Sequence, residues 1–253
     1  MHVSTTLPEW RARRAAYSHK SIGLVPTMGA LHAGHASLVE RARRENEVVQ
    51  VTLFVNPTQF NDPNDLRRYP RTVDEDLALL ESLGADEILM PPADALYPDG
   101  YLFRITAEPL TQIMEGRHRP GFFDGVMTVV MKLFQLAQAN RAYFGEKDFQ
   151  QLQVVTKMAA DFFLPVEVVP CPTVRAASGL ALSSRNNLLS EAGRAKAALI
   201  HQAITQSETA AQAAETLTNA GFQVDYVEDH WNRRFAAAFL EGIRLIDNVP
   251  LEN

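Results

Sequence analysis

The sequence predicts an α/β fold, with a main domain built on a parallel sheet and a small C-terminal α+β domain. Two apolar, strand-like runs, IGLV at 22–25 and VVQVTLFV at 48–55, enclose a segment of helical character, as in a β–α–β unit. Such β-branched runs are typical of parallel strands that are covered on both faces. With 253 residues, the chain is long enough for a main domain and a smaller companion.

The remaining elements follow from apolar periodicity and from proline. Helices are expected over 8–17, 34–46 and 73–83, from 122 onward and after 146. Pro26 is expected to end the first strand, and further strands are expected at 86–90, 141–145 and 166–169. Pro170 and Pro172 indicate a boundary, so that the domains span 1–173 and 174–253. In the second domain we expect two helices, about 191–207 and 208–220, and two strands, around 222–228 and 234–246.

Composition excludes several classes of partner. A formal net charge of −6 argues against a general polyanion binder, so nucleic acid is not an expected partner. No apolar run approaches the ~20 residues that span a bilayer, and the N-terminal segment has no signal-peptide core. We therefore expect a cytoplasmic protein with no membrane partner. The one cysteine, Cys171, is expected to be a small core residue and not a nucleophile.

A glycine-containing turn with two histidines follows the first strand. If a helix begins near it, the three-residue spacing of His32 and His35 puts both imidazoles on one face beside the helix N-terminus. Free N–H groups and the macrodipole favour an anion such as phosphate there. Gly29 and Gly34 are expected to let the backbone approach a ligand. The spacing alone also fits two helix-surface or core histidines.

The segment PTMGALHAGH resembles the HxGH signature of nucleotidyltransferases, and the flanking PTMGAL is similar to the pantothenate synthetase (pantoate–β-alanine ligase) family. The resemblance continues in the family order through FVNPTQF, YPRT, AYFGEKDFQQL, PTVR and GLALSSRN to RLIDN at 244–248. It implies a Rossmann-like nucleotidyltransferase domain and a homodimer. It also implies ATP-dependent condensation of (R)-pantoate with β-alanine through an enzyme-bound pantoyl adenylate, releasing pyrophosphate and then AMP.

The first half of this reaction needs positioning more than acid–base chemistry. A carboxylate with a pKa near ~4 is already ionised when it attacks the α-phosphorus, so no general base is required. Donors must stabilise the charge that develops on the phosphates. The resemblance assigns this chemistry to His32, Lys147 and Arg185, with His35 as proton donor. The ATP-binding residues it implies are Met28, Gly29, Ala30, Leu31, His32, Ala33, Gly34, His35, Gly145, Glu146, Lys147, Asp148, Val174, Leu182, Ser183, Ser184 and Arg185.

The acid-binding residues are expected to be neutral amides. Gln59, Gln151 and Asn56 match positions that bind pantoate or β-alanine, and an amide both donates and accepts without adding a buried charge. Polar surface is the alternative for the glutamines, as a solvated helix start is for Lys147. Gln151 is four residues after Lys147 and is expected one turn further along the same helix.

An acidic cluster follows YPRT. The resemblance implies Mg²⁺ beside ATP, with Glu75 as a candidate ligand among Asp74, Glu75 and Asp76. Three acids at a helix start also fit simple partners of the helix dipole.

Two departures from the family pattern stand out. Phe122 and Asp124 occupy RPGFFDGV, where the family commonly has a histidine and a small or basic residue. The segment between VDYVE and RLIDN is shorter than usual, which predicts a reduced second domain and altered closure over ATP.

Two rival hypotheses remain. One is another HxGH nucleotidyltransferase that acts on a phosphorylated acceptor, which requires basic residues where Gln59 and Gln151 stand. The other is a non-catalytic ATP-binding regulator, against which the intact set of histidines, lysine and arginine argues.

Overall fold

The computed structural model describes residues 1–251, which form two compact units. The larger unit contains Met1–Glu146 and Gln150–Cys171. The smaller unit contains the chain from Pro172 onward together with Lys147–Phe149. The sequence places the boundary at residue 173, and it gives no sign that three residues from the middle of the first domain group with the second. This grouping is important for the site, because Lys147 is one of them.

The larger unit has a six-stranded sheet in which all pairs are parallel, as the sequence predicts. Every residue of the central strand Val48–Leu53 is buried, which explains its continuous apolar character. Successive strands are added first on one side of Ile22–Thr27 and later on its other side. The strand order therefore reverses next to this strand, and open parallel sheets bind ligands at such a point. In spatial order the strands are β1 (His2–Ser4), β4 (Glu87–Leu89), β3 (Val48–Leu53), β2 (Ile22–Thr27), β5 (Arg141–Gly145) and β6 (Glu167–Cys171).

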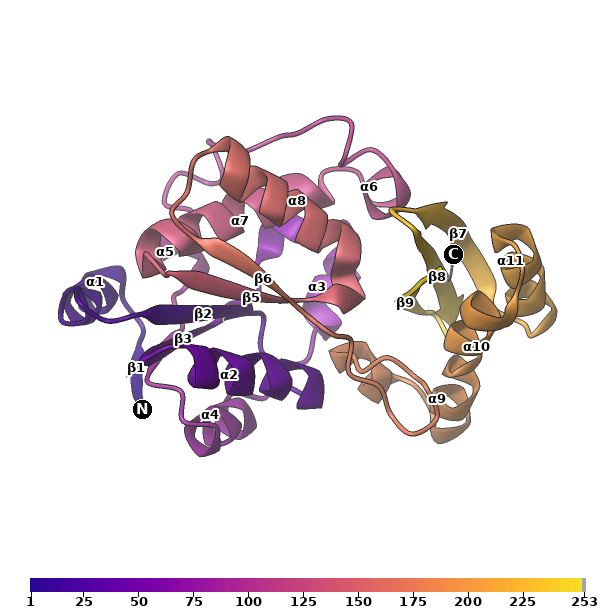
Figure 1. Ribbon diagram of the computed structural model, residues 1–253, viewed down its shortest axis with the longest axis horizontal. Helices are drawn as coiled ribbons and strands as arrows, with labels where there is room; N and C mark the ends of the chain where they lie inside the picture. Colours follow the sequence, from indigo (N-terminus) through magenta and orange to yellow (C-terminus); the bar gives the residue numbers. More distant parts are fainter. Residues whose placement is uncertain (252–253) are drawn as a thin grey trace. The chain divides into compact units, whose positions relative to one another are not determined.

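Helices cover both faces of this sheet (Figure 1). On one face, α2 (Ala33–Glu45) and α4 (Val73–Ser82) pack against the strands in a buried apolar cluster. On the other face, α7 (Phe122–Ala137) contacts β5, with the rings of Phe134 and Phe144 6.3 Å apart. The remaining helices of this unit are α1 (Leu7–Ala15), α3 (Pro63–Arg68), α5 (Ala93–Leu96), α6 (Met114–His118) and α8 (Phe149–Asp161), with 3₁₀ turns η1 (Pro57–Gln59) and η2 (Glu146–Asp148).

Two prolines are placed differently from the prediction. Pro26 was expected to end the first strand, but it lies inside β2. Pairing with β5 ends at Leu24, so the missing N–H of Pro26 breaks no ladder bond on that side. Pro170 lies inside β6, which is an edge strand, and edges tolerate proline. The three-residue edge strand β1 is too short for its sequence to show a period.

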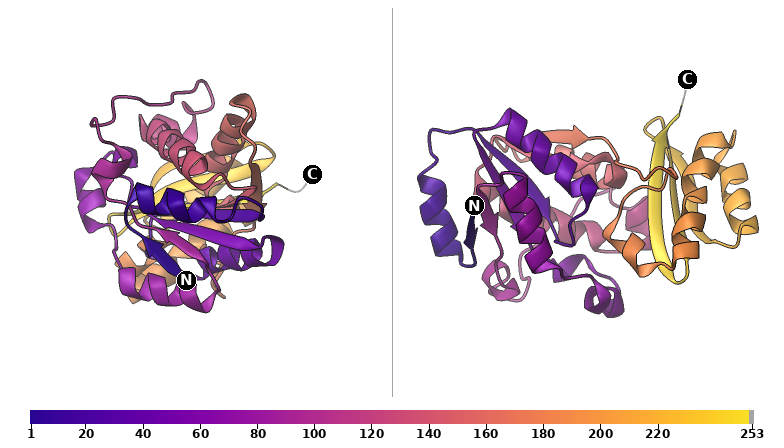
Figure 2. Two further views of the ribbon diagram at one scale, coloured as in Figure 1. Left: turned by 90° about the vertical axis from the view of Figure 1, so that its left-hand side faces the viewer. Right: turned by 90° about the horizontal axis from the view of Figure 1, so that it is seen from below.

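The smaller unit has an antiparallel sheet of β7 (Gln223–His230), β8 (Arg233–Leu240) and β9 (Ile243–Pro250). The predicted α+β class is confirmed, but the strand predicted at 234–246 is two strands. Glu241 and Gly242, with φ of 54° and 74°, form the turn between them. Helices α10 (Leu199–Gln206) and α11 (Ala210–Asn219) pack against one face of this sheet (Figure 2).

The helix predicted at 191–207 is also divided. It forms α9 (Glu191–Ala197) and α10, which meet at Ala198, and the 3₁₀ turn η3 (Ser184–Leu188) precedes them. Within residues 1–251, no helix combines the length and the apolar character required to cross a membrane.

Candidate functional site

The two histidines lie at the start of α2, directly after β2. His32 is the N-cap residue, and its Nδ1 accepts from the backbone N–H of Gly34 at 3.1 Å. The Nδ1 of His35 accepts from the backbone N–H of His32 at 3.4 Å. Because a backbone N–H only donates, neither Nδ1 carries a proton, and each neutral ring has its N–H at Nε2. The predicted helix start is therefore confirmed. The centroids of the two rings lie 4.2 Å apart, and each ring can donate from Nε2.

Gly34 makes room for the His32 ring. A Cβ at this position would lie 2.8 Å from the Cε1 atom of His32, closer than real side chains come. Any other residue would displace the ring and break the cap. The sequence assigned this glycine to ligand approach, and the structure adds a steric reason within the protein.

Asp76 holds the turn before the histidines. Its carboxylate is buried and accepts from the backbone N–H groups of Ala30 at 2.8 Å and Leu31 at 2.7 Å. The Thr72 hydroxyl donates to the same carboxylate at 3.2 Å. Asp76 thus has a structural role. The sequence had instead placed it among the acids that could bind a metal or interact with the helix dipole. The N–H groups of Ala30 and Leu31 are already used within the protein.

The acidic cluster does not converge on a metal. Glu75 is exposed on α4, and Asp76 faces the backbone of the turn. Within residues 1–251, no group of three or more His, Cys, Asp or Glu side chains is arranged to hold a metal ion. The metal role of Glu75 remains a prediction without supporting ligands, so these acids do not fit a resident Mg²⁺ site.

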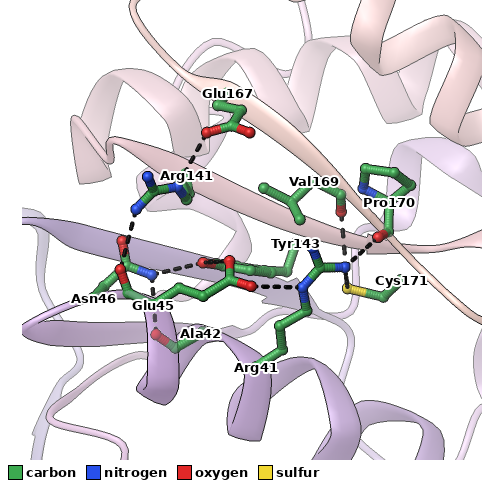
Figure 3. A network of polar contacts seen from close by, with 10 residues as sticks. All are labelled: Arg41, Ala42, Glu45, Asn46, Arg141, Tyr143, Glu167, Val169, Pro170 and Cys171. Carbon is green, nitrogen blue, oxygen red and sulfur yellow. Dashed lines mark hydrogen bonds and ion pairs between the residues drawn. The ribbon is translucent and has the colours of Figure 1, made fainter.

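The far end of α2 is fastened to the sheet by polar side chains (Figure 3). Arg41 donates to the Pro170 carbonyl of β6 at 2.6 Å and to Glu45 at 2.9 Å. The Tyr143 hydroxyl of β5 donates to Glu45 at 2.9 Å and accepts from Asn46 at 2.7 Å. Burial, aided by the bond to Glu45, raises the pKa of Tyr143 to about 12, which keeps this donor protonated. The network fixes the axis of the helix whose other end carries the histidines.

A second cluster lies beyond the carboxyl end of β3. Asn56 is buried, and its amide orientation is fixed by two backbone groups: Oδ1 accepts from Thr58 N at 3.4 Å, and Nδ2 donates to Gly125 O at 3.2 Å. Nδ2 also donates to Gln59 Oε1 at 2.9 Å. The Tyr97 hydroxyl donates to Asn56 Oδ1 at 2.8 Å. Since the oxygen of Gln59 accepts from Asn56, its amino group is the part of the side chain that can donate to another partner.

Tyr97 is a residue that sequence reasoning missed. Burial raises its pKa to about 12, despite its bonds to Thr58 and Asn56, so the hydroxyl remains a donor at neutral pH. It lies 41 residues from Asn56 in the chain. Nothing in the local sequence shows that it meets Asn56.

Close backbone approach brings α7 to this cluster. A Cβ on Gly125 would lie 2.5 Å from the Thr58 carbonyl oxygen, so only glycine allows α7 to contact η1 here. The two departures from the family pattern lie on the same helix. Phe122 is buried, and the Arg119 guanidinium lies 3.7 Å from the centroid of the Phe122 ring. Burial raises the pKa of Asp124, and Arg104 partly offsets this.

The two neighbouring glutamines of α8 differ in role. Gln150 is buried, and its Oε1 accepts from Glu115 N at 3.0 Å. Its Nε2 donates to the carbonyls of Leu110 at 3.1 Å and Ile113 at 2.9 Å. Gln151 is half-buried and takes no part in these bonds. The structure therefore distinguishes a structural glutamine from the predicted ligand-binding one.

The predicted relation between Gln151 and Lys147 is wrong in one respect. Lys147 lies in the 3₁₀ turn η2, and α8 begins only at Phe149, so the two residues are not one turn apart on one α-helix. Lys147 groups with the smaller unit, whereas Gln151 belongs to the larger one. Lys147 Nζ lies 3.7 Å from the Asp148 carboxylate.

The smaller unit also holds the other predicted nucleotide segments. Val174 and Leu182 are joined by a backbone hydrogen bond of 3.0 Å, so 174–182 folds back on itself as a hairpin. Ser183 then caps η3 by accepting from the N–H of Arg185 at 3.3 Å. Ser184 is buried and Arg185 is half-buried. The structure thus gathers Lys147, Val174 and Leu182–Arg185 in one unit, although they are distant in sequence.

Comparison with known proteins gives a match along the whole chain. The family model for pantoate-beta-alanine ligase matches residues 2–250. A pantothenate synthetase of Bdellovibrio bacteriovorus is 51% identical over 242 residues, which are 96% of this chain and 95% of that protein. A pantothenate synthetase of Legionella pneumophila is 47% identical and is matched over 99% of this chain and 100% of its own length. The short C-terminal region is therefore shared with this relative.

Solved structures agree with the fold. A pantoate-beta-alanine ligase from Francisella tularensis, complexed with beta-gamma ATP and beta-alanine, superposes with a TM-score of 0.95 at 39% identity. The match covers 99% of this chain and 97% of that one. A pantothenate synthetase from Thermus thermophilus gives a TM-score of 0.89 at 43% identity, covering 98% of this chain and 99% of that one. The α/β class predicted from sequence is confirmed by both.

Proposed function

This chain belongs to the pantoate-beta-alanine ligase family, and we propose that it joins (R)-pantoate to β-alanine with ATP, through a pantoyl adenylate. The observation that carries the proposal at the site is the pair of Nε2–H donors of His32 and His35, beyond the carboxyl end of β2. This is the point of an open parallel sheet at which nucleotides bind.

In the first half-reaction, the pantoate carboxylate attacks the α-phosphorus of ATP, and the bond to pyrophosphate breaks. The carboxylate needs no base, so the chain contributes position and donors. His32 and His35 donate to phosphate oxygens, and Lys147 and Arg185 neutralise the charge that moves toward pyrophosphate. The Gln59 amino group donates to a carboxylate or hydroxyl oxygen of pantoate, and Gln151 supplies a second amide.

In the second half-reaction, the β-alanine amine attacks the acyl carbon, and the bond to the AMP oxygen breaks. The leaving phosphate gains negative charge, which a neutral Nε2–H stabilises by donating a hydrogen bond, and the proton released from the amine nitrogen leaves to solvent. His35 has this role in the proposal. Its Nδ1 is occupied by the N–H of His32, which keeps the proton at Nε2.

Three further features belong to the proposal. Mg²⁺ would come as part of the ATP substrate and would offset its negative charge, and no side chain of this chain is assigned as its ligand. The protein acts as a homodimer. It works in the cytoplasm on small-molecule substrates, without a nucleic acid or membrane partner.

The test is a coupled assay for AMP formation in which each substrate is omitted in turn. With pantoate, β-alanine and ATP all present, AMP accumulates over many turnovers. Omitting any one should abolish turnover. If AMP forms equally well without pantoate, the chain is a different adenylating enzyme, and if ATP binds without any turnover, it is an ATP-binding regulator.

A further inference from the structure

Strand β9 contains two adjacent polar residues, Asp247 and Asn248, that so far have no role. Neighbouring side chains of a strand point to opposite faces of the sheet. Leu245 and Val249 belong to the apolar cluster under the helices, so Asp247, two residues from each, shares the helix-covered face. Asn248 lies on the opposite face and pairs across the strands with Phe235. The dipeptide therefore reaches both sides of the small sheet.

Asp247 holds the nucleotide hairpin on one side. Its buried carboxylate pairs in a bidentate manner with Arg175, with distances of 2.6 Å from Nη1 to Oδ2 and 2.9 Å from Nη2 to Oδ1. Arg175 follows Val174 and pairs with Ala181 across the hairpin. Bidentate pairs fix geometry as well as supplying energy. The carboxylate thus fixes both arms of the hairpin, and the second arm continues to Leu182–Arg185.

Asn248 holds the lysine turn on the other side. Its Nδ2 donates to the backbone carbonyl of Lys147 at 2.9 Å. Its Oδ1 accepts from Arg233 Nε at 2.7 Å. An arginine only donates, so the amide has one possible orientation, with the amino group toward Lys147.

The turn is held at its other end by aromatic contacts. The ring of Phe149 lies 6.2 Å from Trp231 and 6.0 Å from Phe235. The Arg233 guanidinium lies 4.5 Å from the Phe149 ring centroid. Since Asn248 binds residue 147 and this cluster binds residue 149, the lysine turn has little freedom relative to the small sheet.

We propose that Asp247 and Asn248 are paired positioning residues that align the nucleotide hairpin with the phosphate-binding lysine. This rests on the ATP-binding role proposed for Lys147, Val174 and Leu182–Arg185. One dipeptide links the two segments through a single rigid strand, so their relative position is set before ATP binds. Neither residue needs to touch substrate.

Asn248→Asp tests this most sharply. The carboxylate has the same shape and still accepts from Arg233, but it has no N–H to donate to Lys147 and faces its carbonyl with like charge. We expect a lower melting temperature, because the Lys147 carbonyl loses its donor, together with ATP affinity about five- to tenfold weaker in a calorimetric titration with Mg·ATP alone and an unchanged KM for pantoate. Asp247→Asn should weaken ATP binding in the same range.

Asp225→Asn is the matched control. Asp225 forms an ion pair with Arg244 at 2.7 Å in the same sheet. It should leave ATP affinity at the wild-type value. If Asn248→Asp binds ATP as wild type does, or if ATP and pantoate affinities fall together with the melting temperature, the positioning role is refuted. If the wild-type protein itself binds no ATP, it is the proposed function that fails.

Discussion

The hydrogen bonds that orient the side chains of His35 and Gln59 in the larger unit span different distances along the chain from those that hold the hairpin and the lysine turn in the smaller unit. In the larger unit, His35 is bound to His32 and Gln59 to Asn56, each pair three residues apart. In the smaller unit, Arg175 and Asp247 are 72 residues apart, and Lys147 and Asn248 are 101 apart. Local hydrogen bonds form with the helix or turn that contains them. The long-range bonds require the complete small sheet.

This difference predicts how substitutions should behave. In the larger unit, a site residue can be removed with little effect on its neighbours, because the caps and turns are supported by backbone groups. In the smaller unit, a substitution of Asp247 or Asn248 should weaken ATP binding while pantoate is still recognised. The following variants examine each side of that comparison, beginning with the largest expected effect.

His35→Ala should lower kcat by about 10²–10³, the effect of losing one donor at a site of developing charge. The melting temperature should change little. Ser37→Ala is the control, because Ser37 donates to the Gly34 carbonyl at 2.8 Å in the same helical turn and has no proposed ligand. Steady-state kinetics and thermal unfolding of both variants test this prediction. An equal loss of activity in the two would mean that His35 acts only by capping the helix and not as a donor in the reaction.

Gln151→Ala should weaken pantoate binding about five- to 150-fold, which corresponds to ~1–3 kcal/mol for an unpaired substrate group in a dry pocket. ATP affinity should not change. Gln150→Ala removes the partner of three backbone groups, one of them buried and two partly buried, so it should instead lower the free energy of unfolding. Calorimetric titration and denaturant unfolding separate the two effects. An equal loss of ATP and pantoate affinity in Gln151→Ala would contradict a specific role for Gln151 in pantoate binding.

Asp76→Ala should reduce the free energy of unfolding by about 1–3 kcal/mol, because it leaves the N–H groups of Ala30 and Leu31 without their acceptor. Glu75→Ala on the exposed side of the same helix should be nearly neutral. Urea unfolding curves measure both, and the Mg²⁺ dependence of activity should be the same in Glu75→Ala and wild type. A higher Mg²⁺ requirement in that variant would restore its role as a metal ligand.

Tyr97→Phe should raise the KM for pantoate about two- to tenfold, the effect of one hydrogen bond that orients Asn56 and, through it, Gln59. The KM for ATP should stay constant. Kinetic constants for both substrates provide the check. Unchanged pantoate kinetics would mean that Thr58 and Gly125 orient Asn56 without help.

The smallest expected effect is a pH dependence of stability at His201. Burial, with the positive charge of Arg175, lowers the pKa of His201 below its usual value, and Asp247 only partly offsets this. The unfolded chain then binds the proton more tightly than the folded one, so stability should fall as the pH drops below about 6.5. His201→Gln should flatten that part of the curve of melting temperature against pH, whereas His19→Gln, at an exposed position, should not. Identical curves for the two variants would contradict this.

The sequence was sufficient wherever local pattern decides structure. Buried β-branched runs predicted the parallel strands, and HAGH predicted the start of α2. It was insufficient where distant residues meet: Tyr97 with Asn56, Asp76 with Ala30, and Asn248 with Lys147. The second sheet was undercounted, although Gly242 is a turn signal within the run and forms the turn with Glu241. These contacts depend on tertiary packing, which periodicity does not encode.

The most direct test of the central claim is positional isotope exchange in ATP with pantoate present and β-alanine absent. If the carboxylate attacks the α-phosphorus unaided by the amine, ATP labelled at the αβ-bridging oxygen should scramble its label as bound pyrophosphate rotates and returns. Scrambling should require pantoate. Pantothenate formation by the complete reaction, without any such exchange, would contradict an adenylate formed before the amine binds.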